Sequence, residues 1–140
     1  MDLHGRQRQY VVCGCIRPPR NTPFEDRLVV MFERISQVIE QHKPAEAAVE
    51  STFFGKDAGA AAKLGHARGV LLLALRLRGV PVSHYSPAEI KRSVTGTGRA
   101  SKEQVQFVTS RLLGLAQLPR PLDASDALAV ALCHTFRPGA

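Results

Sequence analysis

Apolar residues recur every three or four positions over residues 24–39, which predicts an amphipathic helix that buries one face. Residues 22–25 (TPFE) precede this stripe in the order of a capping box with proline at the first helical position. A second helix is predicted over residues 58–78, and Gly79 is a suitable stop for it. The first half of that helix is rich in glycine and alanine, so another helix or a second subunit can approach it closely.

Three short apolar runs between the helical stretches predict β-strands. Residues 10–16 (YVVCGCI) are rich in β-forming side chains. Residues 45–50 are apolar enough for a strand buried between layers, and residues 80–85 predict the third strand. Because strands alternate with helices, the sequence predicts an α/β fold with at least partly parallel pairing.

Three shorter helices are predicted in the second half of the chain. Ser101 and Gln104 form a capping box at the start of the middle one, which follows a Thr-Gly-Thr-Gly loop at residues 95–98. The sequence has no internal repeat and no low-complexity segment, so residues 1–140 are expected to form one domain. The predicted helices cover residues 87–94, 101–113 and 123–134.

Positive charge is concentrated in the middle of the chain. The 140 residues carry a formal net charge of +7, with a pI near 9.9. Residues 50–111 hold ten lysines and arginines against four acids, and they account for most of the excess. A basic balance favours a polyanionic partner, either nucleic acid or an anionic membrane surface. A solvated basic surface remains the alternative.

The cysteines and the hydropathy indicate where the protein works. Cys13, Cys15 and Cys133 cannot all pair, which favours free thiols in a reducing compartment. The Cys-x-Cys pair could bind metal, but alternate residues of an extended segment share one face, so we expect packed thiols. The longest apolar run, residues 70–75, is too short to span a bilayer, and we expect a cytoplasmic protein.

Three acidic residues are candidates for chemistry. Glu50 stands at the carboxyl end of a predicted strand, where sites of open α/β sheets lie. Asp123 and Asp126 share one face of the last helix, although a helix cap and a favourable interaction with the helix dipole would explain them too. Converging carboxylates favour a hard divalent cation such as Mg²⁺, and a pair of such ions can drive phosphodiester hydrolysis. His134, at the end of the last helix, either interacts favourably with the helix dipole or assists this metal site.

Basic and aromatic residues supply a candidate DNA-binding surface. Lys91 and Arg92 precede the Thr-Gly-Thr-Gly loop, and Arg99 and Lys102 follow it, so their cations could meet phosphates. The alternative is an ordinary turn between helices. Phe53 lies in a polar, glycine-containing segment after Glu50 and could stack on unpaired bases, although a phenylalanine more often packs into a core.

Three stretches resemble the RuvC family of Holliday-junction resolvases. They are residues 47–70, 90–106 and 122–134, and the resemblance extends from about Gly5 onward. It implies a ribonuclease-H-like mixed sheet flanked by helices and a homodimer that binds four-way junction DNA. It also implies an endonuclease of DNA recombination and repair that makes paired symmetric nicks. Mg²⁺ or Mn²⁺ would be the cofactor, with two ions per active site, and RuvA and RuvB would be partners.

The resemblance also assigns roles to individual residues. Glu50, Asp123 and Asp126 fall on three of the four catalytic, metal-binding carboxylates of the family. Phe53 falls on an aromatic residue that contacts bases near the junction point. Two lysines, Lys91 and Lys102, fall on basic residues that handle DNA during cleavage. The helix rich in small residues would lie near the dimer contact.

One departure from the family concerns the start of the chain. The family begins with a strand that reads roughly Gly-Ile-Asp-Pro-Gly, and its aspartate is the first metal ligand. The sequence has no such motif, and Asp2 does not match it in context or position. An incorrectly assigned start, a shortened chain or a degenerate copy would each explain this. We therefore expect an N-terminally truncated domain of reduced stability and activity, and a protein that binds branched DNA without cutting it is the alternative function.

Overall fold

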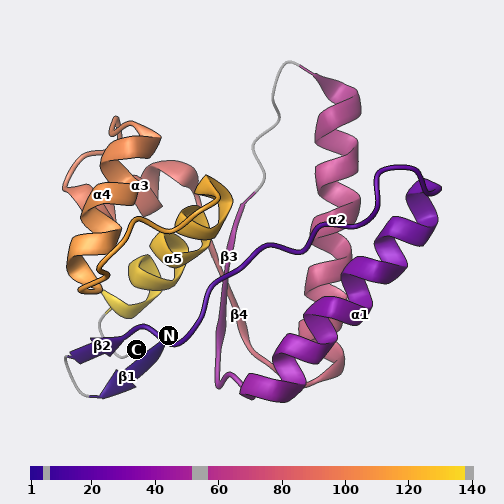
Figure 1. Ribbon diagram of the computed structural model, residues 1–140, viewed down its shortest axis with the longest axis horizontal. Helices are drawn as coiled ribbons and strands as arrows, with labels where there is room; N and C mark the ends of the chain where they lie inside the picture. Colours follow the sequence, from indigo (N-terminus) through magenta and orange to yellow (C-terminus); the bar gives the residue numbers. More distant parts are fainter. Residues whose placement is uncertain (5–6, 52–56, 138–140) are drawn as a thin grey trace. The chain divides into compact units, whose positions relative to one another are not determined.

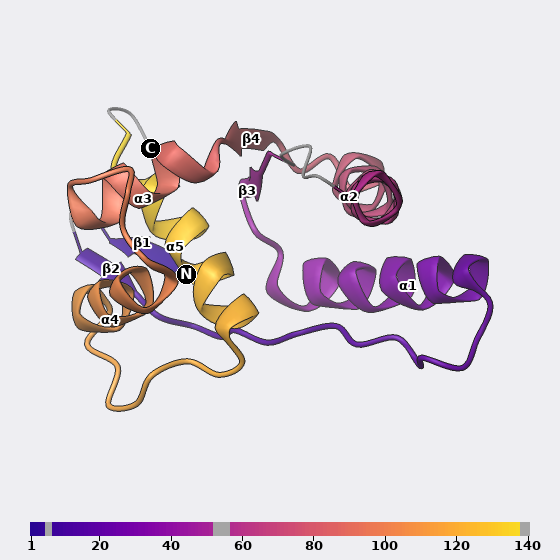
Figure 2. The same cartoon turned by 90° about the horizontal axis from the view of Figure 1, so that it is seen from above.

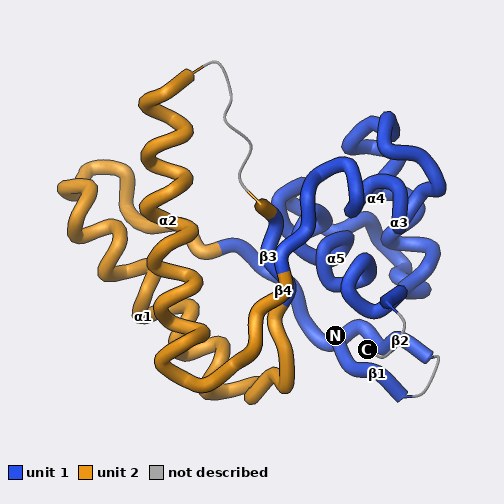
Figure 3. The backbone as a smooth tube through the Cα atoms, turned by 180° about the vertical axis from the view of Figure 1, so that it is seen from behind, with its two compact units in different colours: residues 1–15, 48–50, 84–140 blue, residues 16–47, 51–83 orange. Residues whose placement is uncertain are grey.

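The computed structural model describes residues 1–4, 7–51 and 57–137, and its contacts divide the chain into two compact units (Figure 3). The first unit contains residues 1–15, 48–50 and 84–140. The second contains residues 16–47 and 51–83. Each unit is described by itself, and one domain over residues 1–140 stays a prediction.

The second unit is built on two long helices, α1 (Phe24–His42) and α2 (Ala58–Leu77), which pack against each other and cross at an angle (Figures 1 and 2). Their ends are joined by an ion pair in which Nη2 of Arg78 lies 2.5 Å from Oε1 of Glu40. None of the helices among the described residues is both long and apolar enough to cross a bilayer. Both helices lie where the apolar pattern predicts them.

The starts of these two helices differ from each other in how they are capped. The predicted capping box before α1 is wrong, because Pro23 is its N-cap and makes no side-chain hydrogen bond. The Thr22 hydroxyl donates instead to the Pro19 carbonyl at 3.0 Å, so it stabilises the preceding turn rather than the helix. At α2, the Asp57 carboxylate accepts a hydrogen bond from the Ala60 N–H at 3.0 Å and satisfies one free donor.

In the described part of the chain, four short strands form two separate two-stranded sheets. The strands β3 (Ala47–Glu50) and β4 (Val82–Tyr85) are hydrogen-bonded neighbours, and α2 lies in the connection between them. A helical crossover of this length is the connection that parallel neighbours use. The other sheet is an antiparallel hairpin of β1 (Asp2–His4) and β2 (Gln7–Gln9).

The strand predicted at residues 10–16 is wrong. These residues follow β2 without regular structure, and Val11 and Val12 are exposed. Local bonds hold part of the segment, since the Cys13 N–H donates to the Tyr10 hydroxyl at 3.2 Å. A high β-propensity produces a strand only where a neighbouring strand supplies the ladder, and here the polar residues of the hairpin have that partner instead.

The first unit has its core around three helices, α3 (Pro87–Thr95), α4 (Lys102–Leu112) and α5 (Leu122–Thr135) (Figure 1). The helix α5 contributes most to this core, because most of its apolar residues are buried. All three cysteines are free, as expected, and Cys133 is one of the buried residues of α5. Cys15 is exposed, so the expected packing of the Cys-x-Cys thiols is wrong for this residue. The buried cluster consists of Tyr85, Ile90, Val94, Ala100, Val105, Ala129, Val130, Leu132 and Cys133.

Capping boxes fix the starts of both α3 and α4. The Ser86 hydroxyl accepts from the Glu89 N–H at 3.2 Å, while the Glu89 carboxylate accepts from the Ser86 N–H at 2.7 Å. Ser101 and Gln104 repeat this arrangement at 3.2 and 2.8 Å, which confirms the predicted box. Because two otherwise free donors are satisfied reciprocally, each box sets the residue at which its helix begins.

Candidate active site

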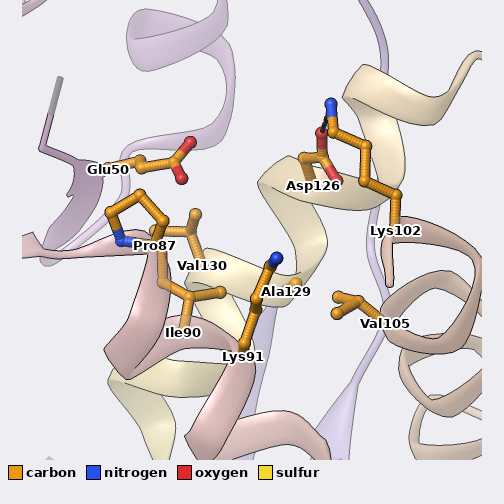
Figure 4. A pocket seen from close by; sticks show the side chains of 9 residues that line it. All are labelled: Glu50, Pro87, Ile90, Lys91, Lys102, Val105, Asp126, Ala129 and Val130. Carbon is orange, nitrogen blue, oxygen red and sulfur yellow. Dashed lines mark hydrogen bonds and ion pairs between the residues drawn. The ribbon is translucent and has the colours of Figure 1, made fainter. Parts of the chain in front are cut away.

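The first unit contains a pocket of about 200 Å³ that combines acidic and basic groups on an apolar floor (Figure 4). Its charged residues are Glu50, Asp126, Lys91 and Lys102. Two carboxylates and two ammonium groups around one cavity are what a site for a metal ion and a phosphate needs. The apolar lining residues are Pro87, Ile90, Val105, Ala129 and Val130.

Each charged residue of the pocket is held by a different element. Glu50 is the last residue of β3 and follows the buried Val49, so the strand carries the carboxylate out of the core. Asp126 lies on α5, where the buried residues after it hold it at the edge of the core. Lys91 lies on α3, and Lys102 is the first residue of α4. In Figure 4 the Glu50 carboxylate points toward Asp126, and Lys91 points into the same space.

The two carboxylates interact electrostatically. The pKa of Glu50 is raised, first because its carboxyl group loses part of its hydration and second because of the negative charge of Asp126. The ammonium groups of Lys102 and Lys91 act in the opposite direction and lower it. Nζ of Lys102 also lies 3.5 Å from Oδ2 of Asp126. A cation between the two acids would relieve their repulsion, which is the electrostatic condition of a metal site.

Asp123 does not line this pocket. It lies in the first turn of α5, one turn before Asp126, and it is exposed. It is not the N-cap, because Pro121 has that position in α5, and the N-cap makes no side-chain hydrogen bond. Within the described residues, no group of three or more histidine, cysteine, aspartate or glutamate side chains could hold a metal ion. The structure therefore brings Glu50 and Asp126 together, and the three-carboxylate ligand set stays a prediction.

The Thr-Gly-Thr-Gly loop connects the basic residues of α3 to those of α4. The Thr95 hydroxyl lies within hydrogen-bonding distance of the carbonyls of Lys91, at 2.8 Å, and Thr97, at 3.1 Å, so the loop is tied to the end of α3. Gly96 ends the helix with φ of +80°, a conformation that favours glycine. Arg92 and Arg99 are both exposed on either side of this loop.

Phe53 and His134 are the remaining two predicted residues. Phe53 lies outside the described residues, so its role stays a prediction. His134 does not line the pocket. Its Nδ1 lies 2.7 Å from the hydroxyl of Tyr85, and the two rings meet edge to face. This histidine therefore has a structural contact, and the proposed assistance to the metal site gains no support from its position.

Several pocket residues were not predicted from the sequence. Pro87, Ile90 and Val130 line the cavity beside the charged groups. The apolar periodicity of α3 and α5 indicates that Ile90 and Val130 are buried, but it does not indicate what they face. Only the packing of α3 against α5 makes them the floor of a site.

Comparisons with known proteins identify the class of molecule. A family model described as "Crossover junction endodeoxyribonuclease RuvC" matches residues 1–134. The chain is 45% identical to the RuvC protein of Protochlamydia amoebophila, over 97% of this chain and 81% of that protein. It is 44% identical to the RuvC protein of Thermotoga maritima, over 98% of this chain and 82% of that protein. These relatives are endodeoxyribonucleases, enzymes that hydrolyse DNA.

Solved structures agree with the sequence relatives. Thermus thermophilus RuvC in complex with a Holliday junction substrate is similar with a TM-score of 0.89 and 32% identity, over 97% of this chain and 82% of that one. A second Thermus thermophilus RuvC structure gives 0.84 and 34%, over 93% and 78%. The chain belongs to the RuvC family of crossover junction endodeoxyribonucleases. The expected ribonuclease-H-like α/β class is thereby confirmed, and metal-dependent cleavage is typical of this family.

Proposed function

We propose that this protein is a structure-selective endonuclease that resolves four-way DNA junctions by paired symmetric nicks during recombination and repair. The observation that carries the proposal is the pocket in which Glu50 and Asp126 lie beside Lys91 and Lys102. The four-way junction is supported as the substrate by membership of the RuvC family and by the similarity in fold to a RuvC bound to a Holliday junction. Hydrolysis with an activated water needs no covalent intermediate on the enzyme.

The metal would be Mg²⁺, with Mn²⁺ as a substitute, and two ions would serve each active site. Glu50 and Asp126 are suitable ligands for Mg²⁺, because this ion keeps several waters and needs only one or two carboxylates. Asp123, one turn from Asp126, would complete the set. When bound, the metal supplies a water of lowered pKa and stabilises the negative charge on the leaving oxygen.

The basic residues would bind and orient the DNA. Lys91 and Lys102 would contact the phosphates nearest the scissile bond, since they line the same pocket as the carboxylates. Arg92 and Arg99, both exposed beside the Thr-Gly-Thr-Gly loop, would contact phosphates further along the strand. Phe53 would stack on a base at the junction point.

The assembly would be a homodimer, because two symmetric nicks need two active sites related by a two-fold axis. The α2 helix, rich in small residues, would lie near the contact between the two subunits. RuvA and RuvB, which move the branch point, would be the partners, and work on chromosomal junctions would take place in the cytoplasm.

A cleavage assay on a labelled four-way junction tests the proposal. Glu50→Gln and Asp126→Asn keep the shape of each side chain but remove a negative charge. We expect each to lower the rate of nicking in Mg²⁺ at least about 100-fold. Junction binding in Ca²⁺ should remain, because these substitutions leave the four basic residues, Lys91, Lys102, Arg92 and Arg99, unchanged. Unchanged nicking by both variants, or equal nicking of plain duplex by the wild type, would refute the proposal.

A second candidate is a protein that binds branched DNA without cutting it. The observation in its favour is that the described residues place two carboxylates in the pocket rather than three. The junction should then be retarded in a gel with Ca²⁺ and stay intact after Mg²⁺ is added. Paired nicks at symmetric positions would exclude this candidate.

A further inference from the structure

Lys102 occupies a helix position that helix electrostatics disfavours. It is the first residue of α4, directly after the N-cap Ser101. The N-terminus of a helix carries a partial positive charge, so acids are stabilising there and a lysine is repelled. The stability of α4 therefore does not account for this lysine. A residue that conflicts with its local environment is often placed for function.

The contact that Lys102 makes is with Asp126, and it is a loose one. Nζ lies 3.5 Å from Oδ2, and the side chains are 63% and 35% exposed, respectively (Figure 4). Ion pairs as accessible as this are weak, because water and salt screen them and two side chains must be ordered. Lys102 can therefore release Asp126 at little cost.

The charges of the pocket balance without any bound ion. Glu50 and Asp126 carry two negative charges, and Lys91 and Lys102 carry two positive ones. A divalent cation held by Asp126 would lie near the ammonium group of Lys102, and the two positive charges would repel each other. Among the described residues, Lys91 makes no ion pair with Asp126, so only Lys102 stands in direct competition.

We propose that Lys102 is an exchangeable counter-ion for Asp126, which neutralises this carboxylate before a divalent cation binds and then turns to a DNA phosphate. The inference rests on the proposed function, because it takes Asp126 as a metal ligand. It makes Lys102 a positioning residue that links metal binding to DNA binding. The ammonium group keeps the acid compensated while the site is empty, and its release adds a phosphate contact when the site is filled.

The proposal is tested by measuring how tightly the full chain binds Mn²⁺ without DNA. The electron paramagnetic resonance signal of the unbound ion reports the binding. Lys102→Met is compared with Lys91→Met, since each removes one positive charge from the lining of the same pocket. Both should bind Mn²⁺ more tightly than the wild type. Lys102→Met should exceed Lys91→Met by about two- to fivefold, the ratio that a surface ion pair supports. Equal affinities of the two variants, or no Mn²⁺ binding by any of the three proteins, would overturn the proposal.

A DNA-binding measurement provides the second readout. The wild type should bind a four-way junction more tightly in Ca²⁺ than in EDTA, and Lys102→Met should lose much of this gain while Lys91→Met keeps it. An identical gain in both variants contradicts the release of Lys102. The nicking assay separates this inference from the proposed function. A protein that nicks junctions but shows no difference between the variants retains its function and loses the counter-ion. A protein that never nicks junctions but shows a clear difference between the variants retains the counter-ion and loses the proposed function.

Discussion

The hydroxyl of Tyr85 lies 2.7 Å from Nδ1 of His134, which joins the end of β4 to the last turn of α5. Tyr85 is 2% exposed and belongs to the buried cluster, so this bond lies at the core of the first unit. The guanidinium of Arg137 lies over the same ring, 4.5 Å from its centre. Strand, helix and the residues after the helix are therefore held together around one aromatic side chain.

Removing this hydroxyl should destabilise the protein modestly. Tyr85→Phe keeps the buried ring but leaves the His134 nitrogen without this partner. We expect a loss of about 1 kcal/mol in the free energy of unfolding, the usual net value of one hydrogen bond. Urea denaturation measures it. A double-mutant cycle with His134→Ala should attribute most of the loss to the pair, and additive effects would show that the two residues do not interact.

The capping box of α3 predicts a pH dependence. Hydrogen bonds from the Ser86 side chain and backbone hold the pKa of Glu89 below its usual value. The carboxylate binds its proton less readily in the folded state, so its contribution to stability is present at neutral pH. That contribution is lost as the pH falls below about 4.3 and through the lower pKa of the folded protein.

The corresponding experiment compares the wild type with Glu89→Gln between pH 7 and pH 3. The wild type should have the higher urea midpoint at pH 7, and the difference should shrink toward acid. Other carboxylates titrate in both proteins, so the difference isolates Glu89. A difference that is constant across this range would show that the carboxylate charge does not matter to the box.

Two glycines of the Thr-Gly-Thr-Gly loop should respond differently to alanine. Gly96 has φ of +80°, where a side chain is strained, so Gly96→Ala should cost about 1–2 kcal/mol. At Gly98 a Cβ atom would lie 3.5 Å from the Ala88 carbonyl oxygen, which is an ordinary contact. Gly98→Ala should therefore change stability by less than about 0.5 kcal/mol. Thermal unfolding of the two variants checks the order, and a larger loss for Gly98→Ala would contradict it.

The core of the first unit should be most sensitive on α5. Leu132 is fully buried, so Leu132→Ala should cost about 2–5 kcal/mol through lost burial and the cavity left behind. Leu112 on α4 is 47% exposed and provides the matched control, for which we expect less than about 1 kcal/mol. Equal losses measured by urea denaturation would mean that α5 is not the centre of this core.

The sequence predicts helices better than strands in this protein, and the reason is physical. A helix bonds within itself, so the stripe at residues 24–39 and the box of Ser101 and Gln104 contain most of the information. A strand needs a partner that may lie far away in the sequence. The run at residues 10–16 therefore has the composition of a strand without being one, while the polar residues 7–9 form one.

The candidate site was predictable where position in an element decided it. Glu50 follows a buried strand and Asp126 precedes a buried helical stretch, and both facts are visible in the sequence. The pairing of Lys102 with Asp126 was not predictable, because it depends on how α4 lies against α5. The same holds for the absence of Asp123 from the pocket lining, since residues one turn apart on a helix need not reach the same cavity.

The helix α5 presents Asp126 to the pocket and buries Leu128 to Val130 in the core, yet Ala127 between them is exposed. This makes Ala127 a natural attachment point for a fluorophore or spin label, introduced as a cysteine after the half-buried Cys13 and the exposed Cys15 have been changed to serine. A reporter there would sit next to a pocket carboxylate without entering the packed interior. It would allow metal loading and DNA arrival to be followed in time as separate events.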